Sequence, residues 1–311
     1  MFVNAHRLSF RVAAVAAALV LPFAACSNGS RATTPALTAD VRITATNAAE
    51  VAGAVYHAAF DLVRVARVVG GFLQIAPLPT ATASPGAGPQ LRAQTVDGPE
   101  GGTAILTWDD RDGDGGYTSG DVLGLACDQY AEHGVVLTGA VTLDQLVIDG
   151  NVPDGLGWIL TARMRLVGLQ ATIGASTNTL DGTFRLGRER RQTVFLLSVV
   201  ADQPVALGTR ELAAGNATAR NDYLLDFSMG LFADGAVDDP VLGGTLTYAT
   251  KAPLTGLQAL PDPSAGLLEV RGAGGTKLAM VPLDFFTLEL QVDEDGDGEI
   301  DATIPAEWAQ F

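Results

Sequence analysis

The stretch Phe286-Thr287-Leu288-Glu289-Leu290-Gln291-Val292 determines the fold class, because its apolar and polar residues alternate strictly. Successive side chains of a β-strand point to opposite faces, so this alternation predicts a strand with one buried face and one solvated face. The same alternation runs from Leu160 to Leu166 and from Leu225 to Leu231. Consecutive strands of this kind predict an antiparallel sheet.

Further strand candidates follow one another through the last two thirds of the chain. They lie near 103–108, 122–127, 135–148, 182–187, 193–200, 243–249, 266–271 and 277–283. The 36 glycines and 15 prolines favour many turns and short strands over long helices. We therefore expect residues 102–311 to form a mainly β domain: an antiparallel meander that makes a curved sheet, a sandwich or an open barrel.

A first acidic loop follows the strand candidate at 103–108. It reads Asp110-Arg111-Asp112-Gly113-Asp114-Gly115-Gly116-Tyr117-Thr118-Ser119-Gly120-Asp121. Acids at positions one, three, five and twelve, with glycine at six, resemble the EF-hand loop, in which about six to eight oxygens surround Ca²⁺. The candidate metal ligands are Asp110, Asp112, Asp114, the carbonyl of Gly116, Thr118 and Asp121. The flanking segments are predicted strands, whereas those of an EF-hand are helices.

A second acidic loop, Asp293-Glu294-Asp295-Gly296-Asp297-Gly298-Glu299-Ile300-Asp301, follows the strand at 286–292. Its candidate ligands are Asp293, Asp295, Asp297, Glu299 and Asp301. Position twelve is Ile304, so a last ligand would have to come from elsewhere in the chain. Both loops could instead be solvated acidic turns, since aspartate and glycine are common turn formers. Closely spaced aspartates repel one another unless a cation neutralises them, which favours a structural Ca²⁺.

One helix is expected before the sheet, over residues 46–71. Asn47 and Glu50 have the spacing of a capping box, in which each side chain satisfies a free backbone N–H. One face carries apolar residues at helical spacing, and the polar stripe opposite is narrow: Glu50, His57, Asp61 and Arg64. A stripe this narrow predicts that a sheet covers most of the helix. The proline- and glycine-rich residues 72–101 are predicted to be a loop or linker.

The first 25 residues have the pattern of an export signal. Residues 1–11 are basic and contain no acid, and the apolar stretch that follows is too short to span a bilayer. It ends in Leu21-Pro22-Phe23-Ala24-Ala25-Cys26, which resembles a lipobox. That resemblance implies a lipid on Cys26, a lipidated tether over residues 26–45 and, because Ser27 follows, an outer-membrane location. The alternative is ordinary cleavage near Ala25, with Cys26 an incidental thiol.

A family resemblance rests on the two acidic loops together with their flanks. The segment from Trp108 through the first loop to a strand ending at Cys127, and the segment from Leu290 to Trp308, are similar to a group of uncharacterised proteobacterial lipoproteins. The resemblance implies a place in the cell envelope, facing the periplasm or the surface. It brings no known activity.

The remaining observations bound the function. A formal net charge of −16 repels phosphate backbones, so no nucleic-acid partner is expected. The sequence has no nucleophile elbow and no phosphate-binding loop, so no enzyme is predicted. We expect a lipid-anchored protein with a calcium-stabilised β domain and a structural or binding role towards an unknown protein or small molecule. Two alternatives stay open. One is a periplasmic carrier of lipids or other hydrophobic ligands, of the unclosed-barrel type; the other is a calcium-stabilised hydrolase with paired carboxylates.

Overall fold

The computed structural model describes residues 39–74, 90–113, 115–150, 157–191, 194–201, 203–222, 228–257 and 262–311. The chain divides into two units, Met1–Ala36 and Leu37–Phe311, and all described residues belong to the second. The predicted signal peptide, Cys26, the first part of the tether and Asp114 lie outside the described residues. Among the helices of the described part, none is both long enough and apolar enough to cross a membrane.

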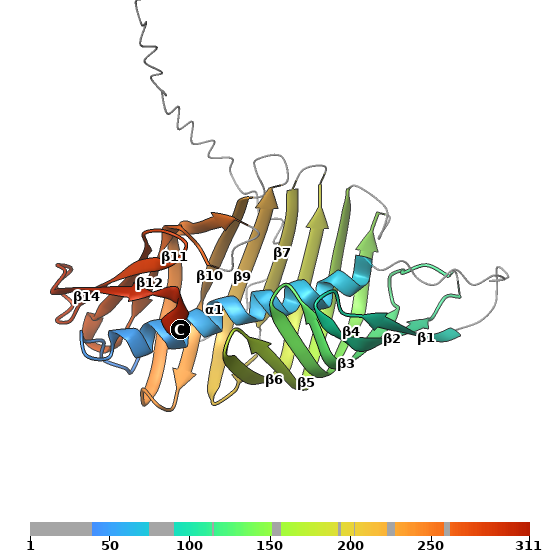
Figure 1. The fold of residues 1–311 in the computed structure, drawn as a ribbon, viewed down its shortest axis with the longest axis horizontal. Helices are drawn as coiled ribbons and strands as arrows, with labels where there is room; N and C mark the ends of the chain where they lie inside the picture. The colour runs from blue at the N-terminus through green and yellow to red at the C-terminus, as the bar shows by residue number, and fades with distance from the viewer. Residues whose placement is uncertain are drawn as a thin grey trace, which may run out of the picture. The chain divides into compact units, whose positions relative to one another are not determined.

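Fifteen β-strands in the described part of the chain form one antiparallel sheet, and one long α-helix lies against it (Figure 1). The helix α1 is Ala48–Gly71, followed by the short 3₁₀ helix η1 (Phe72–Gln74). The strands are β1 Gln90–Asp97, β2 Gly101–Asp110, β3 Val122–Glu132, β4 Val135–Asp149, β5 Trp158–Ile173, β6 Ser176–Arg190, β7 Val194–Ala201, β8 Val205–Leu207, β9 Arg210–Asp222, β10 Ser228–Asp239, β11 Gly244–Leu257, β12 Ala265–Arg271, β13 Lys277–Pro282, β14 Thr287–Asp293 and β15 Ala302–Glu307. Two more 3₁₀ helices are η2 (Ala273–Gly275) and η3 (Trp308–Gln310).

The order of the strands in the sheet is the order in the chain, apart from the short β8, which pairs with β6 and β9. Strands β1 and β15 are the two ends of the series and do not pair with each other, so the sheet is open. The predicted fold class, a mainly β antiparallel meander with one N-terminal helix, is confirmed. Of the three predicted forms, the open curved sheet is the one adopted.

Strand β14 shows how the alternating pattern produces this sheet. Leu288, Leu290 and Val292 are fully buried, whereas the residues between them are only partly covered. Leu290 lies opposite Met280 of β13 and Ile304 of β15, so one apolar row continues from strand to strand. Phe286, the first residue of the predicted strand, instead lies in the preceding turn. Its N–H donates a hydrogen bond to the Asp284 carboxylate, and its side chain is exposed.

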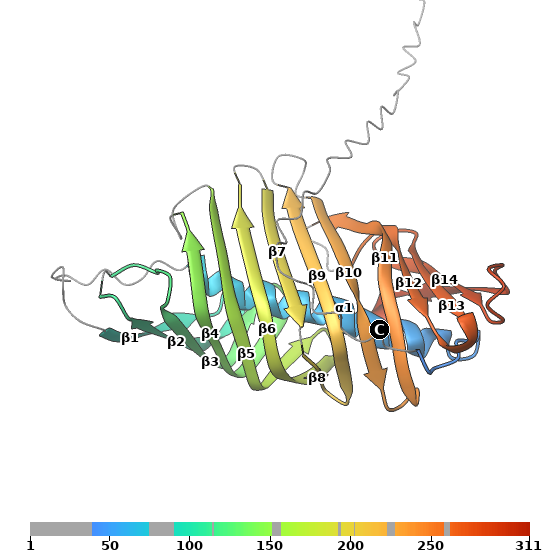
Figure 2. The same cartoon turned by 180° about the vertical axis from the view of Figure 1, so that it is seen from behind.

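Helix α1 runs across the strands on one face of the sheet (Figures 1 and 2), where it contacts β4, β7, β9, β10, β13 and β14. Consecutive residues such as Ala58, Ala59 and Phe60 are all buried. Successive residues of a helix point about 100° apart, so α1 is covered on nearly all sides. A flat sheet covers one side of a helix only. The sheet therefore curves around α1, and Trp308 of η3 packs on Phe60. The predicted cover of the helix is confirmed.

Two local predictions differ from the structure. The Asn47 side chain does not cap α1; its Oδ1 accepts the N–H of Thr44 at 2.8 Å, because the turn before the helix competes for the same oxygen. The predicted linker 72–101 contains β1, and its last residue, Gly101, begins β2. Strand β1 lies at the end of the sheet, and its half-covered positions are Arg92, Gln94 and Val96. Because two of these three are polar, no apolar alternation marks the strand.

Candidate metal centres

The first acidic loop connects β2 to β3 and begins at Asp110, whose side chain is completely buried. Asp110 Oδ1 accepts the N–H of Gly113 at 2.7 Å, and Oδ2 accepts the N–H of Gly115 at 3.1 Å. These bonds fold the loop back over the carboxylate. Both glycines have positive φ angles, +73° and +83°, which glycine adopts without the strain that a side chain would cause.

Asp121, the residue before β3, closes the same loop and is also buried. Its Oδ1 accepts the N–H of Arg111 at 3.0 Å, and its Oδ2 accepts the indole N–H of Trp108 at 3.1 Å and the N–H of Thr118 at 3.0 Å. The Thr118 hydroxyl donates to Asp112 at 2.8 Å. The two ends of the loop are therefore joined through carboxylate oxygens.

One carboxylate oxygen from each of Asp110, Asp112 and Asp121 lies within 4.8 Å of the other two, a grouping that could hold a metal ion. Thr118 adjoins this cluster through Asp112 and Asp121. Asp114 lies outside the described residues, and the part of the Gly116 carbonyl in the site stays a prediction. The structure thus brings together positions one, three and twelve of the predicted site, which are eleven residues apart at the extremes.

Burial disfavours the ionised form of the Asp110 carboxyl. Burial raises the pKa of this carboxyl above its usual range, and the N–H groups of Gly113 and Gly115 only partly counter it. Arg92 of β1 donates to Asp110 Oδ2 at 3.2 Å, and its guanidinium lies 4.8 Å from the centre of the Trp108 ring. A buried aspartate beside two further aspartates is an environment in which a divalent cation would be favourable.

The second acidic loop connects β14 to β15 and repeats the geometry of the first. Asp293, buried at the end of β14, accepts the N–H of Gly296 at 2.7 Å through Oδ1 and the N–H of Gly298 at 3.0 Å through Oδ2. The glycines stand three and five residues after the aspartate, as in the first loop, and again have positive φ angles, +80° and +98°. The same local sequence therefore builds the same turn at two places in the sheet.

The rest of the second loop is more open. One oxygen from each of Asp293, Asp295 and Asp297 forms a cluster within 4.8 Å that could hold a metal ion, but only Asp293 is buried. Asp301 accepts the N–H of Glu294 at 2.7 Å and is exposed. Neither Glu299 nor Asp301 belongs to the cluster, so two of the five predicted ligands of this loop stand apart from it.

The Asp293 carboxyl differs electrostatically from Asp110. Burial is the largest single influence and acts to raise its pKa, but the N–H groups of Gly296 and Gly298 and the ammonium of Lys277 on β13 together outweigh it, and the pKa lies below its usual range. Lys277 Nζ is 3.3 Å from Asp293 Oδ2. The ionised form of Asp293 is therefore already stabilised by groups of the protein itself.

The second loop also holds the segment that leads into α1, a contact that the sequence did not predict. Glu294 Oε1 accepts the N–H of Ala45 at 2.6 Å, and the Glu294 carbonyl accepts a hydrogen bond from Arg42 at 3.2 Å. These residues are about 250 positions apart in the chain, and no local pattern could have indicated the contact.

The described residues contain no thiol suited to nucleophilic chemistry. Cys127 on β3 is buried, and burial raises the pKa of its thiol to about 11. A thiol that stays protonated at neutral pH is a poor nucleophile and a poor metal ligand. Cys127 therefore acts as a small apolar residue of the core.

Comparison with protein-family models, curated proteins and solved structures finds no match. The similarity to proteobacterial lipoproteins accordingly stays a prediction from the sequence. The fold and the site support a coarser statement: this is a mainly β protein in which two hairpins each carry an aspartate cluster that could hold a metal ion.

Proposed function

We propose that this chain is an exported lipoprotein, attached to the outer membrane through Cys26, whose β domain is stabilised by Ca²⁺ at the two acidic loops. Its role is structural or binding. The observation that carries the proposal is the repeated geometry of the loops, in which Asp110 and Asp293 each gather further carboxylates around one point. The cell-envelope location rests on the N-terminal sequence pattern alone.

The donor set supports calcium over a transition metal. Every side-chain ligand in both clusters is a carboxylate oxygen. Hard cations such as Ca²⁺ take six to eight oxygens in flexible geometry, whereas Zn²⁺ and Cu²⁺ favour nitrogen and sulfur ligands. Neither cluster contains a histidine or a cysteine. Loop carbonyls and water would complete the coordination in each hairpin.

The position of the loops supports a structural role over a sensing role. The two loops lie near opposite ends of the sheet. The first joins β2 to β3, and the second joins β14 to β15. Extracellular calcium modules bind with a Kd of roughly 10⁻⁴–10⁻³ M. At ten times Kd, one occupied site stabilises the folded state by about 1.4 kcal/mol, so calcium would secure both end hairpins.

A thermal melt tests the calcium proposal. The mature chain with Cys26→Ser is unfolded in chelator and then in millimolar Ca²⁺, with Mg²⁺ as the control cation. We expect Ca²⁺ to raise the Tm by about 3–6 °C per occupied site. Asp112→Ala should remove the contribution of the first loop and Asp295→Ala that of the second. Both residues are exposed, so both variants should fold. A Tm that Ca²⁺ leaves unchanged would disprove the calcium proposal.

A separate experiment tests the anchor. Cells that express the full chain are fed a labelled fatty acid, and the chain is then isolated. Label should appear on the wild-type chain and be absent from Cys26→Ala, which should be released from membranes in soluble form. Equal release of the two chains would show that Cys26 is an ordinary thiol near a cleavage site.

A carrier of hydrophobic ligands is the second candidate, and one observation favours it: an open sheet curves around a helix that is apolar on most sides. In the structure α1 itself occupies the covered face of the sheet. A lipid could bind there only by displacing helix residues. Mass spectrometry of the purified chain decides between the two candidates. Co-purified lipid in stoichiometric amount supports the carrier, and its absence supports the structural or binding role.

A further inference from the structure

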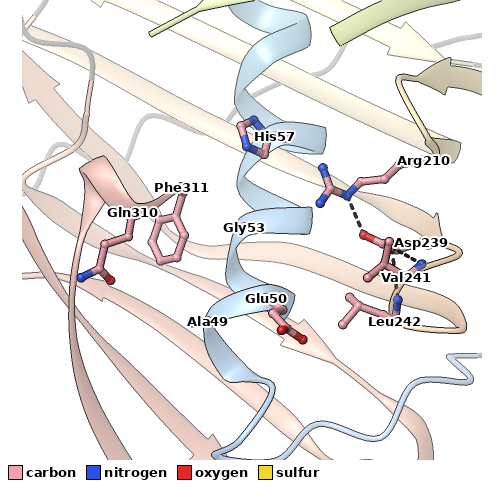
Figure 3. Close-up of a pocket in the computed structure, with 10 residues that line it drawn as sticks. All are labelled: Ala49, Glu50, Gly53, His57, Arg210, Asp239, Val241, Leu242, Gln310 and Phe311. Atoms are coloured by element: carbon pink, nitrogen blue, oxygen red, sulfur yellow. Dashed lines mark hydrogen bonds and ion pairs between the residues drawn. The ribbon is translucent and has the colours of Figure 1, made fainter. Parts of the chain in front are cut away.

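A cleft of about 340 Å³ opens beside the first turns of α1 (Figure 3). One side is formed by Glu50, Gly53 and His57 of the helix, and the other by residues of β9 and of the hairpin that joins β10 to β11. The C-terminal Phe311 also lines it. The volume is that of a pocket for a small molecule. None of the residues of the two acidic loops lines it.

Arg210 of β9 presents two hydrogen-bond donors to this cleft. Its Nε donates to Asp239 Oδ2 at 2.5 Å, and the buried Asp239 is itself fixed by the N–H groups of Val241 and Leu242, at 2.8 and 3.2 Å. The two terminal nitrogens of Arg210 have no partner among the described residues, and they point toward α1 in Figure 3. A guanidinium held in this way can bind a carboxylate with two parallel bonds.

His57 contributes a second oriented polar group. Its Nδ1 lies 2.8 Å from Asp61 Oδ2, and Asp61 is buried and also accepts a hydrogen bond from Asn178. With Nδ1 bonded to the carboxylate, Nε2 is the ring nitrogen available to a ligand. The polar stripe predicted on α1 therefore contributes to the cleft, because its residue His57 is oriented by Asp61 and lines the cleft.

The charges of the cleft select the kind of ligand. Arg210 and Asp239 neutralise each other, whereas the exposed Glu50 adds a negative charge that has no ion pair among the described residues. A simple anion would meet that charge, and a simple cation would leave the two Arg210 donors unused. A molecule that carries both a carboxylate and an ammonium group satisfies both ends. Gly53, Leu242 and the ring of Phe311 provide apolar surface between them.

We propose that this cleft binds a small zwitterion of the amino-acid class. The carboxylate lies on the terminal nitrogens of Arg210, the ammonium group faces Glu50, and an apolar side chain occupies the space above Gly53 beside Phe311. This binding site goes beyond the structural role proposed for the acidic loops and does not rest on calcium or on the lipid anchor.

Calorimetric titration of the whole chain with three related compounds tests the proposal. L-leucine carries both charges, N-acetyl-L-leucine lacks the ammonium group, and L-leucinamide lacks the carboxylate. We expect saturable binding of leucine with a Kd in the millimolar range, and binding of each analogue weaker by about tenfold or more. N-acetylleucine loses the ion pair with Glu50, and leucinamide loses one of the two bonds to Arg210. Absence of saturable leucine binding overturns the proposal, and so does tighter binding of N-acetylleucine than of leucine.

Two variants show whether the binding belongs to this cleft. Arg210→Lys keeps a cation beside Asp239 but removes the pair of terminal donors, and it should weaken leucine binding about tenfold. Gly53→Leu should fill the cleft and abolish binding, with Gly53→Ala as the matched control, because an added Cβ meets only Phe311 Cδ1 at an ordinary 3.6 Å.

The Tm of each variant is measured beside its affinity. Replacing a helical glycine favours the helix, so neither Gly53 variant should be less stable than the wild type. Leucine binding that persists unchanged in Arg210→Lys or in a folded Gly53→Leu overturns the assignment to this cleft. If Gly53→Leu fails to fold, the result with Arg210→Lys and the order of the three compounds still decide the proposal.

Discussion

The two acidic loops have the same turn but different surroundings. In each, the last residue of a strand is a buried aspartate that binds two glycine N–H groups, three and five positions further on. In the first loop the closing residue, Asp121, is buried and bonded to Trp108; in the second the closing residue, Asp301, is exposed. The comparison shows that the Asp-Gly pattern determines the turn, whereas the neighbouring strands determine how deeply its carboxylates are buried.

The difference bears on how much each loop gains from a cation. Burial raises the pKa of Asp110, so its ionised form is costly in the folded protein. The pKa of Asp293 is lowered, because the N–H groups of Gly296 and Gly298 and the ammonium of Lys277 together outweigh its burial. We therefore expect calcium to matter more to the first loop. Two similar sequence patterns can therefore build the same turn and still differ in how much a cation stabilises it.

The largest expected difference is between Asp121→Ala and Asp301→Ala, compared in chelator by urea unfolding. Asp121→Ala leaves the buried indole N–H of Trp108 and two backbone N–H groups without their acceptor, at a cost of about 3 kcal/mol or more. Asp301→Ala removes an exposed acceptor and should cost within about 1 kcal/mol. Equal costs would show that the two loops close in the same way.

The next difference concerns the cations that the neighbouring strands supply. Arg92→Met removes the guanidinium that donates to the buried Asp110 and should cost about 2 kcal/mol in chelator. Lys277→Met should have a smaller effect, since Lys277 is partly solvated. Millimolar Ca²⁺ should offset part of both losses, which is measured as a larger Ca²⁺-induced rise in Tm than in the wild type. A rise that is smaller in Arg92→Met would show that Arg92 supports metal binding at the first loop.

The two buried aspartates should act on stability in opposite directions as pH changes in chelator. The pKa of Asp293 is lowered on folding, so its contribution is present above about pH 4, the ordinary pKa, and is lost as pH falls through the folded value. The pKa of Asp110 is raised, so its contribution is greatest at low pH and is lost as pH rises from about 4 through the folded value.

Urea unfolding at a series of pH values checks this with two variants. Asp293→Asn should flatten the acid loss of stability. Asp110→Asn should remove a gain on acidification and so make the net acid loss steeper. Variants that change the profile in the same direction would contradict the assigned environments.

The smallest expected effect belongs to Glu299→Gln. The Glu299 carboxylate is exposed and lies outside the aspartate cluster of the second loop, so stability in chelator should change by no more than about 0.5 kcal/mol. The rise in Tm on adding Ca²⁺ should equal that of the wild type. A smaller rise would show that Glu299 is a ligand of the second loop, as the sequence pattern predicts.

The strands could be predicted from the sequence wherever their buried faces are apolar. Leu288, Leu290 and Val292 identify β14 because solvent on one side and core on the other impose a period of two. Strand β1 gave no such signal, since Arg92 and Gln94 share its covered positions. The helix was found to within two residues at either end, but its cap was not, because Asn47 bonds to the preceding turn.

The acidic loops were local enough to be predicted, whereas the cleft was not. Asp110, Asp112 and Asp121 belong to one hairpin, so their spacing in the sequence already implies their meeting in space. Arg210 and His57 come from a strand and a helix more than 150 residues apart. Only the packing of α1 on the sheet brings them to one cleft, and no local sequence pattern predicts which strands pack against which turns of the helix.

The place of α1 in the chain has a consequence for biosynthesis. The helix, Ala48–Gly71, precedes every described strand, yet the strands that cover it extend to β14, Thr287–Asp293. At about 5–20 residues per second, roughly 10–40 s of translation separate the helix from its last covering strand. During that interval the sheet that covers the helix is incomplete. The first helix of this domain to be made is therefore among the last elements to be completely covered, and a chaperone that holds it has most of the period of synthesis in which to act.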